Sequence, residues 1–153
     1  MNSYFNEKDL HSVDLKGRVL LPKDVRDKHH LKKGDVLYFT PNMSGAAYVE
    51  IRTDTQWKKH REQLLIAAEE GETKKEAFRY ADFFTQPATI DGQGRMSIPE
   101  RVRGMCGLAG YVAIVDMEEH IEVWAKESIE QKYADMVRAF KEMNDRIFGR
   151  TKK

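Results

Sequence analysis

The chain has 153 residues, of which 26 are Lys or Arg and 25 are Asp or Glu, so its formal net charge is +1. This length fits one ordinary domain or two very small ones. Halves of about 75 residues bury little core alone, so we expect them to interleave into a single body. A single cysteine excludes an internal disulfide and favours a reducing, cytoplasmic setting. The longest apolar runs have five residues, so we expect neither a secretory signal nor a membrane span.

Charge is distributed unevenly along the chain. Residues 1–53 carry a net charge of +2 and residues 125–153 a net charge of +3, whereas residues 91–124 carry −3. A near-neutral chain binds a polyanion weakly. A role with nucleic acid would therefore depend on a local basic patch or on several copies acting together.

The first half of the sequence predicts short strands, tight turns and one short helix. Asp14 can accept hydrogen bonds from the backbone two residues further on, and Gly17 supplies a positive φ, so a turn is expected there. Pro22 suits the first position of a helix. The predicted elements are a strand over 10–13, a turn over 14–17, a strand over 18–21, a helix over 22–31, and a hairpin with strands over 36–40 and 46–52.

The second half repeats this order of elements. It predicts a strand over 88–91, a turn over 92–94, a strand over 95–98, a short helix that starts at Pro99 and ends near Gly104 or Gly107, and a hairpin with strands over 111–115 and 120–124.

Longer helices follow each hairpin. One begins at a cap at Thr53 or Asp54, and another covers 73–84 with Ala77, Phe78 and Phe84 expected to face the core. The last covers about 127–148 and carries apolar residues at helical spacing. That stripe favours packing or a subunit contact over a cofactor site.

A nine-residue segment occurs twice. Asp14-Leu-Lys-Gly-Arg-Val-Leu-Leu-Pro22 returns 77 residues later as Asp91-Gly-Gln-Gly-Arg-Met-Ser-Ile-Pro99. The same offset pairs Val25 with Val102, Arg26 with Arg103 and Leu31 with Leu108. We therefore expect two copies of one module, related by an approximate two-fold axis, each presenting an arginine-bearing turn.

These paired segments resemble the two signature segments of the MraZ family, bacterial transcription regulators related to the AbrB type. The similarity extends to the hairpin ends Tyr48-Val-Glu-Ile51 and His120-Ile-Glu-Val-Trp124 and to Phe83-Phe84. It implies an α+β fold, a pseudo-two-fold swapped-hairpin β-barrel with short helices and longer peripheral helices. A first module over 1–80 and a second over 81–153 would interleave as one globular body.

The resemblance also implies a function. Such proteins assemble into rings, bind short direct repeats in double-stranded DNA, and act as repressors or modulators of the division and cell-wall gene cluster, in the cytoplasm and at the nucleoid. The alternative is an antitoxin-like or adaptor module that binds a protein and has no specific DNA target. An enzyme, a small-molecule substrate, a membrane partner and a cofactor are not expected.

Arg18 and Arg95 are the leading candidates for DNA contact, because an arginine just past an exposed turn can offer a bidentate fork to guanine or phosphate. The alternative is that each arginine pairs with the aspartate of its own turn, and the repeat is consistent with both. Further candidates for the DNA-binding face are Lys16, Gln93, Arg26 and Arg103. The residues expected to structure the turns are Asp14, Gly17, Asp91 and Gly94.

Neither a metal site nor a catalytic nucleophile is expected from the sequence. His29 and His30 are adjacent on a predicted helix, so their side chains point apart, and the remaining histidines are scattered. No zinc-binding spacing occurs, and nothing near Cys106 marks it as activated.

Overall fold

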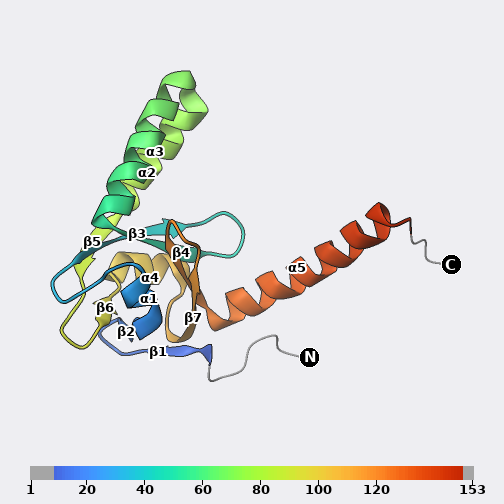
Figure 1. Ribbon diagram of the computed structural model, residues 1–153. Coiled ribbons are helices and arrows are strands. Elements are labelled where there is room, and N and C mark those ends of the chain that lie inside the picture. The colour runs from blue at the N-terminus through green and yellow to red at the C-terminus, as the bar shows by residue number, and fades with distance from the viewer. Residues whose placement is uncertain (1–8, 150–153) are drawn as a thin grey trace.

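The computed structural model describes residues 9–149, which form two antiparallel sheets and helices on their periphery (Figure 1). The strands are β1 (His11–Val13), β2 (Arg18–Leu20), β3 (Val36–Asn42), β4 (Tyr48–Thr53), β5 (Gln86–Thr89), β6 (Arg95–Ser97), β7 (Gly110–Asp116) and β8 (Ile121–Ala125). The helices are α1 (Lys23–Lys28), α2 (Asp54–Ala67), α3 (Glu72–Phe84), α4 (Glu100–Cys106) and α5 (Lys126–Ile147), with the 3-10 turn η2 (Ala68–Glu70) between α2 and α3. No helix in the described range is long and apolar enough to cross a membrane.

The two halves of the chain exchange their first strands. The larger sheet has the order β1-β7-β8-β4-β3-β5, so β1 pairs with β7 of the second half and β5 pairs with β3 of the first. β2 and β6 form a separate two-stranded ribbon. Replacing each strand by its counterpart leaves both pairings unchanged, which places the approximate two-fold axis between β4 and β8, where Glu50 is paired with Glu122. The expected α+β swapped-hairpin barrel is confirmed.

The core fills the space between the larger sheet and the ribbon. Val19 of β2 and Met96 of β6 point inward and are at most 1% exposed, as are Phe39 and Val123 of the larger sheet. Burying a side chain of this size contributes about 1.5–3 kcal/mol. Because Val19 and Met96 are buried, the residues that alternate with them along β2 and β6 point away from the core.

Two helical projections leave this body (Figure 1). α2 begins with the expected cap, since the Thr53 side chain accepts from the Gln56 N–H and the Gln56 side chain accepts from the Thr53 N–H. α2 and α3 form a hairpin joined by an Arg61–Asp82 ion pair of 2.7 Å. α5 extends separately, and Ile129 near its start is the buried residue that anchors it.

Two local expectations are wrong. The first short helix ends at Lys28, because His30 adopts a φ of 55° and the Leu31 N–H turns back to the Arg26 carbonyl. Ala77 is exposed, because α3 turns Ala81 toward the rest of the protein instead.

Arg103 of α4 crosses to the glycine turn of the first half. Its side chain lies against Gly17, and its Nε donates to the Ile98 carbonyl at 2.9 Å. The Ile98 N–H donates in turn to the Gly17 carbonyl at 2.9 Å. The turn and the arginine are thus locked together through one backbone segment.

Arg26 of α1 makes the symmetric contact with the second turn. Its side chain lies against Gly94, its Nε donates to the Leu21 carbonyl at 2.9 Å, and the Leu21 N–H donates to the Gly94 carbonyl at 3.0 Å. Both turns therefore need glycine for its positive φ and for the space that a side chain would occupy.

The contact between Arg103 and Gly17 predicts that Gly17 is more sensitive to substitution than another glycine of the same backbone conformation. A Cβ at Gly17 (φ +80) would lie 2.2 Å from Arg103 Nε, whereas one at Gly34 (φ +88) would meet nothing within 4 Å. Gly34→Ala should lower the free energy of unfolding by about 1–2 kcal/mol through backbone strain. Gly17→Ala should lower it by about 1–3 kcal/mol more, through overpacking.

Equilibrium urea unfolding of both variants and of the Gly17→Ala/Arg103→Ala double variant measures this difference. Removing the arginine should relieve the overpacking, so the two substitutions should couple by about 1 kcal/mol or more. Equal losses of unfolding free energy at the two glycines, or strict additivity in the double variant, would contradict a tight contact between Arg103 and Gly17.

Candidate nucleic-acid interface

The first turn is held by the side chain of Asp14. Its Oδ1 accepts from the backbone N–H groups of Lys16 and Arg18, both at 2.9 Å, and its Oδ2 accepts from Arg18 Nε at 2.7 Å. The Gly17 N–H donates to the Asp14 carbonyl at 2.9 Å and closes the turn. The aspartate therefore fixes both the backbone and the direction of the Arg18 side chain.

The second turn has the same geometry. Asp91 Oδ1 accepts from the N–H groups of Gln93 and Arg95 at 2.8 and 2.9 Å, and Oδ2 accepts from Arg95 Nε at 2.8 Å. The pairing of each arginine with its own aspartate, which the sequence left as one of two interpretations, is thus present in both turns.

These contacts also set the electrostatics of the two carboxyl groups. The backbone N–H of Arg18 lowers the pKa of Asp14 most, and the Arg18 side chain and the Lys16 N–H lower it further. Asp91 has a lowered pKa for the same reasons, with Arg95 and Gln93 as donors. Both carboxylates stay ionised through the neutral range, so both ion pairs persist there.

The β2–β6 ribbon brings the two turns onto one face. In its register Arg18 lies opposite Ser97 and Leu20 lies opposite Arg95, while Val19 and Met96 between them point into the core. Arg18 and Arg95 therefore share the outer face, and their side chains are 32% and 33% exposed. We call the outer side chains Arg18, Leu20, Arg95 and Ser97 the ribbon face.

The other sequence candidates lie around this face in different settings. Lys16 and Gln93 are exposed at the tips of the two turns. Arg26 and Arg103 are half-buried against the glycines of the two turns, and their Nε atoms donate to backbone carbonyls. Their position makes them supports of the turns whether or not they also contact a ligand.

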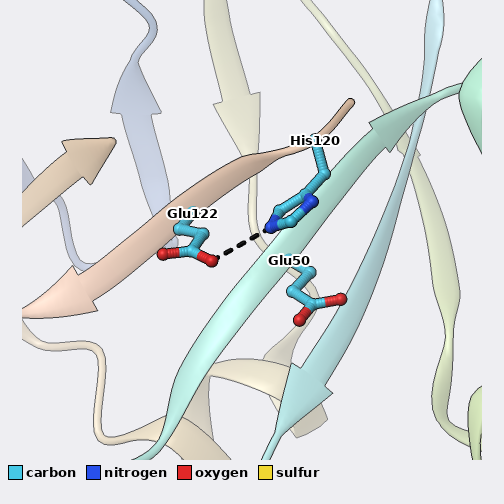
Figure 2. A group of neighbouring side chains, drawn as sticks. All are labelled: Glu50, His120 and Glu122. Atoms are coloured by element: carbon cyan, nitrogen blue, oxygen red, sulfur yellow. Dashed lines mark hydrogen bonds and ion pairs between the residues drawn. The ribbon is translucent and has the colours of Figure 1, made fainter. Parts of the chain in front are cut away.

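A polar cluster that the sequence reasoning missed lies on the opposite side of the larger sheet from the core. Glu50 of β4 and Glu122 of β8 face each other there, with His120 directly before β8 (Figure 2). His120 Nε2 is 3.0 Å from Glu122 Oε2, and Arg52 Nη2 is 2.9 Å from Glu50 Oε1. The spacing of His120 and Glu122, which puts both side chains on one face of a strand, was the available signal.

Neither Cys106 nor His29 offers an activated group. Burial raises the pKa of the Cys106 thiol to about 11, and its Sγ lies 3.4 Å from the Tyr48 carbonyl as a weak donor. The His29 ring is enclosed, with Nε2 at 3.1 Å from Asp116 Oδ1 and Nδ1 at 3.1 Å from Gln56 Nε2. Both side chains are therefore engaged in structural contacts.

Comparison with known proteins gives consistent matches. A sequence model of the family described as "MraZ protein, putative antitoxin-like" matches residues 84–151. A protein named "Transcriptional regulator MraZ" from Finegoldia magna is 30% identical over 135 residues, which cover 86% of this chain and 84% of that protein. A protein of the same name from Dictyoglomus turgidum is 27% identical over 139 residues, which cover 90% of this chain and 91% of that protein.

Among solved structures, the solution structure of PHS018 from Pyrococcus horikoshii is 18% identical and covers 74% of this chain and 82% of that chain. Its TM-score is 0.35, so the similarity supports no argument about fold or function.

The paired turns predict a specific response of the carboxyl groups to loss of one arginine. Arg18→Ala removes the side-chain donor to Asp14 but keeps the backbone N–H, which is the larger cause of its lowered pKa. The pKa of Asp14 should rise part of the way to its ordinary value, while that of Asp91 stays low as an internal control. Carbon-13 NMR titration of the carboxyl groups measures both, and an unchanged Asp14 pKa would refute the ion pair.

Proposed function

Because the chain belongs to the MraZ family, we propose that it is a transcription regulator that binds double-stranded DNA through the ribbon face. The MraZ relatives it matches are named transcriptional regulators and not enzymes. The observation that carries the proposal is that Arg18 and Arg95 lie diagonally across the ribbon on the same outward face. The protein would then act in the cytoplasm, at the nucleoid.

The shape of the ribbon suits the major groove of DNA. That groove admits a two-stranded β-ribbon, and guanine presents two acceptors there that match an arginine fork. The bonds from Arg18 to Asp14 and from Arg95 to Asp91 engage Nε, and within residues 9–149 neither arginine uses Nη1 or Nη2 in a hydrogen bond. The ion pair would thus orient each arginine side chain and leave its Nη1 and Nη2 groups available to DNA.

Multiple copies would supply the affinity that one near-neutral chain lacks. The formal net charge is only +1, so a single copy gains little from the general attraction to phosphate. A ring of subunits on direct repeats would place several ribbon faces on one DNA and gain avidity without a new contact. The target that fits the family is the region upstream of the division and cell-wall genes, where the protein would act as a repressor.

An exposed apolar stripe on α5 supports self-association. Met136, Phe140, Met143 and Ile147 are between 47% and 66% exposed along this helix. Such residues repeated along one helix face are unfavourable in water and are typical of a contact between subunits. We infer that neighbouring subunits of the ring cover this stripe.

The DNA-binding proposal predicts loss of sequence preference when either arginine of the ribbon face is removed. A bidentate contact with a base contributes about 1–3 kcal/mol of discrimination, so Arg18→Ala and Arg95→Ala should each reduce the preference by about 5–150-fold. The measurement is fluorescence anisotropy with the upstream DNA of the gene and a scrambled duplex, across a series of salt concentrations. Arg79→Ala, an exposed arginine on α3, is the control with the same charge change.

Unchanged preference in both ribbon variants would rule out the ribbon face as the reading surface. Equal weak binding of the intact protein to both duplexes would favour the antitoxin-like or adaptor alternative, in which a protein is the partner. A uniform loss for both duplexes would make the arginines phosphate contacts instead of base contacts.

Self-association through α5 makes a separate prediction. Phe140 is 61% exposed on the apolar stripe, and its neighbour Lys141 is exposed on another side of the helix. Phe140→Ser should lower the molar mass found by light scattering after size exclusion, because it removes apolar surface from the contact, whereas Lys141→Ser should leave it unchanged. An unaltered mass in Phe140→Ser would show that α5 is not the subunit contact.

A further inference from the structure

We propose that Glu50, His120 and Glu122 form a binding site for a divalent transition-metal ion, of which zinc fits best. The site lies on the approximate two-fold axis, between the central strands β4 and β8 (Figure 2). It is on the face of the larger sheet away from the core and apart from the ribbon face, so it is independent of the proposed DNA contact.

The backbone already brings the three side chains together. Glu50 and Glu122 are direct partners in the β4–β8 register, and His120 precedes Glu122 by two residues. One potential ligand atom from each of the three residues lies within 4.8 Å of the others. A tetrahedral zinc site with bonds of about 2.0–2.2 Å has ligand atoms about 3.3 Å apart, so small side-chain rotations would close this cluster around an ion.

The donor set selects the class of metal. One imidazole nitrogen and two carboxylate oxygens are ligands that suit zinc, whereas calcium and magnesium prefer oxygen alone. His120 Nε2 and Glu122 Oε2, now 3.0 Å apart, would both turn their lone pairs to the ion, with the ring proton on Nδ1. Water would supply the fourth ligand.

Hydrogen bonds from neighbouring side chains hold the two carboxylates in place. Trp124 Nε1 donates to Glu122 Oε1 at 2.9 Å, which leaves Oε2 for the ion. Asn42 Nδ2 and the Tyr48 hydroxyl donate to Glu50 Oε2 at 3.0 and 3.2 Å. Such outer contacts orient metal ligands and are a usual part of a metal site.

The positive charge of Arg52 disfavours a metal ion at the site but does not cancel the charge of both carboxylates. Its Nη2 donates to Glu50 Oε1 at 2.9 Å, and its side chain is 6% exposed. The one arginine and two carboxylates of the cluster together carry a net charge of −1. Glu50 makes three hydrogen bonds with neighbours, so one of the roughly four lone-pair positions of a carboxylate remains for a metal.

An ion and its water ligand could reach the cluster from the surface. A cavity of about 170 Å³, lined by His60 of α2 and by Arg52, extends to His120. A larger cleft beside α5 is also lined by Glu122. The cavity has room for a water molecule, which needs about 10–15 Å³ of such space.

Zinc at this position would join the two halves of the chain. Glu50 comes from the first half and His120 and Glu122 from the second, so the ion would bridge the central strand pair. An ion that binds the folded state alone raises its stability in proportion to the logarithm of its concentration above Kd. The site would thus couple the integrity of the barrel to metal supply.

The test uses the full chain stripped of metal by a chelating resin. Zinc is titrated in competition with a fluorescent zinc chelator, and Co²⁺ serves as a second probe because its visible absorption reports its coordination. We expect the unaltered chain to bind one zinc ion. Glu50→Gln and His120→Gln should each reduce the zinc affinity at least tenfold, because loss of even an outer-shell partner costs about 10–100-fold. His30→Gln, an exposed histidine outside the cluster, should bind as the unaltered chain does.

Arg52→Gln sharpens the test, because removing the competing cation should tighten zinc binding if Glu50 is a ligand. Circular dichroism confirms that each variant is folded, and Glu122→Gln replaces any variant that is not. Absence of zinc binding at millimolar concentration would overturn the proposal. So would binding that survives unchanged in Glu50→Gln or His120→Gln, or that weakens in Arg52→Gln.

Discussion

The exchange of first strands between the two halves is the constraint on which the rest of the structure depends. β1 completes the sheet beside β7 and β5 completes it beside β3, so neither half has a finished sheet of its own. Such pairings join residues distant in sequence and carry a cost in loop-closure entropy, which burial of the shared core offsets. Because tight turns lead directly from β1 to β2 and from β5 to β6, the exchange forces β2 and β6 to meet. The shared outer face of Arg18 and Arg95 follows from that meeting.

The aspartate, glycine and arginine that recur in the signature segment each have a structural contact that explains their repetition. Aspartate bonds the turn and the arginine, glycine leaves room for the arginine of the other half, and that arginine in turn bonds the strand end. A motif can therefore recur for reasons of folding alone, and its recurrence does not by itself identify a binding surface. What singles out Arg18 and Arg95 is their placement on the outer side of the ribbon, whereas the side chains of Arg26 and Arg103 pack against the glycines of the two turns.

Much of the local structure could be predicted from the sequence, because it depends on short-range chemistry. Asp14 with Gly17 specified a turn, and Thr53 with Gln56 specified a helix start. The end of the first short helix could not be read, since His30 takes a left-handed conformation that nothing in its neighbourhood requires. Nor could the partner of β1, because a strand of three residues, His11–Val13, carries too little pattern to choose among seven others. The cluster of Glu50 with Glu122 escaped notice for the same reason: it exists only once the register of β4 and β8 is known.

The two-fold axis explains why the two copies differ where they meet. A strict repeat would place two identical faces in contact, and like charges such as Glu50 and Glu122 directly opposite each other are destabilising. Because both copies belong to one chain, each can supply different neighbours. The first contributes Tyr48 and Arg52 to Glu50, and the second contributes His120 and Trp124 to Glu122. A homodimer of one module has no such freedom, since any residue it places at the axis appears twice. The same freedom gives Lys16 to one turn and Gln93 to the other, so covalent linkage of the two modules makes the outer surface asymmetric on a nearly symmetric fold.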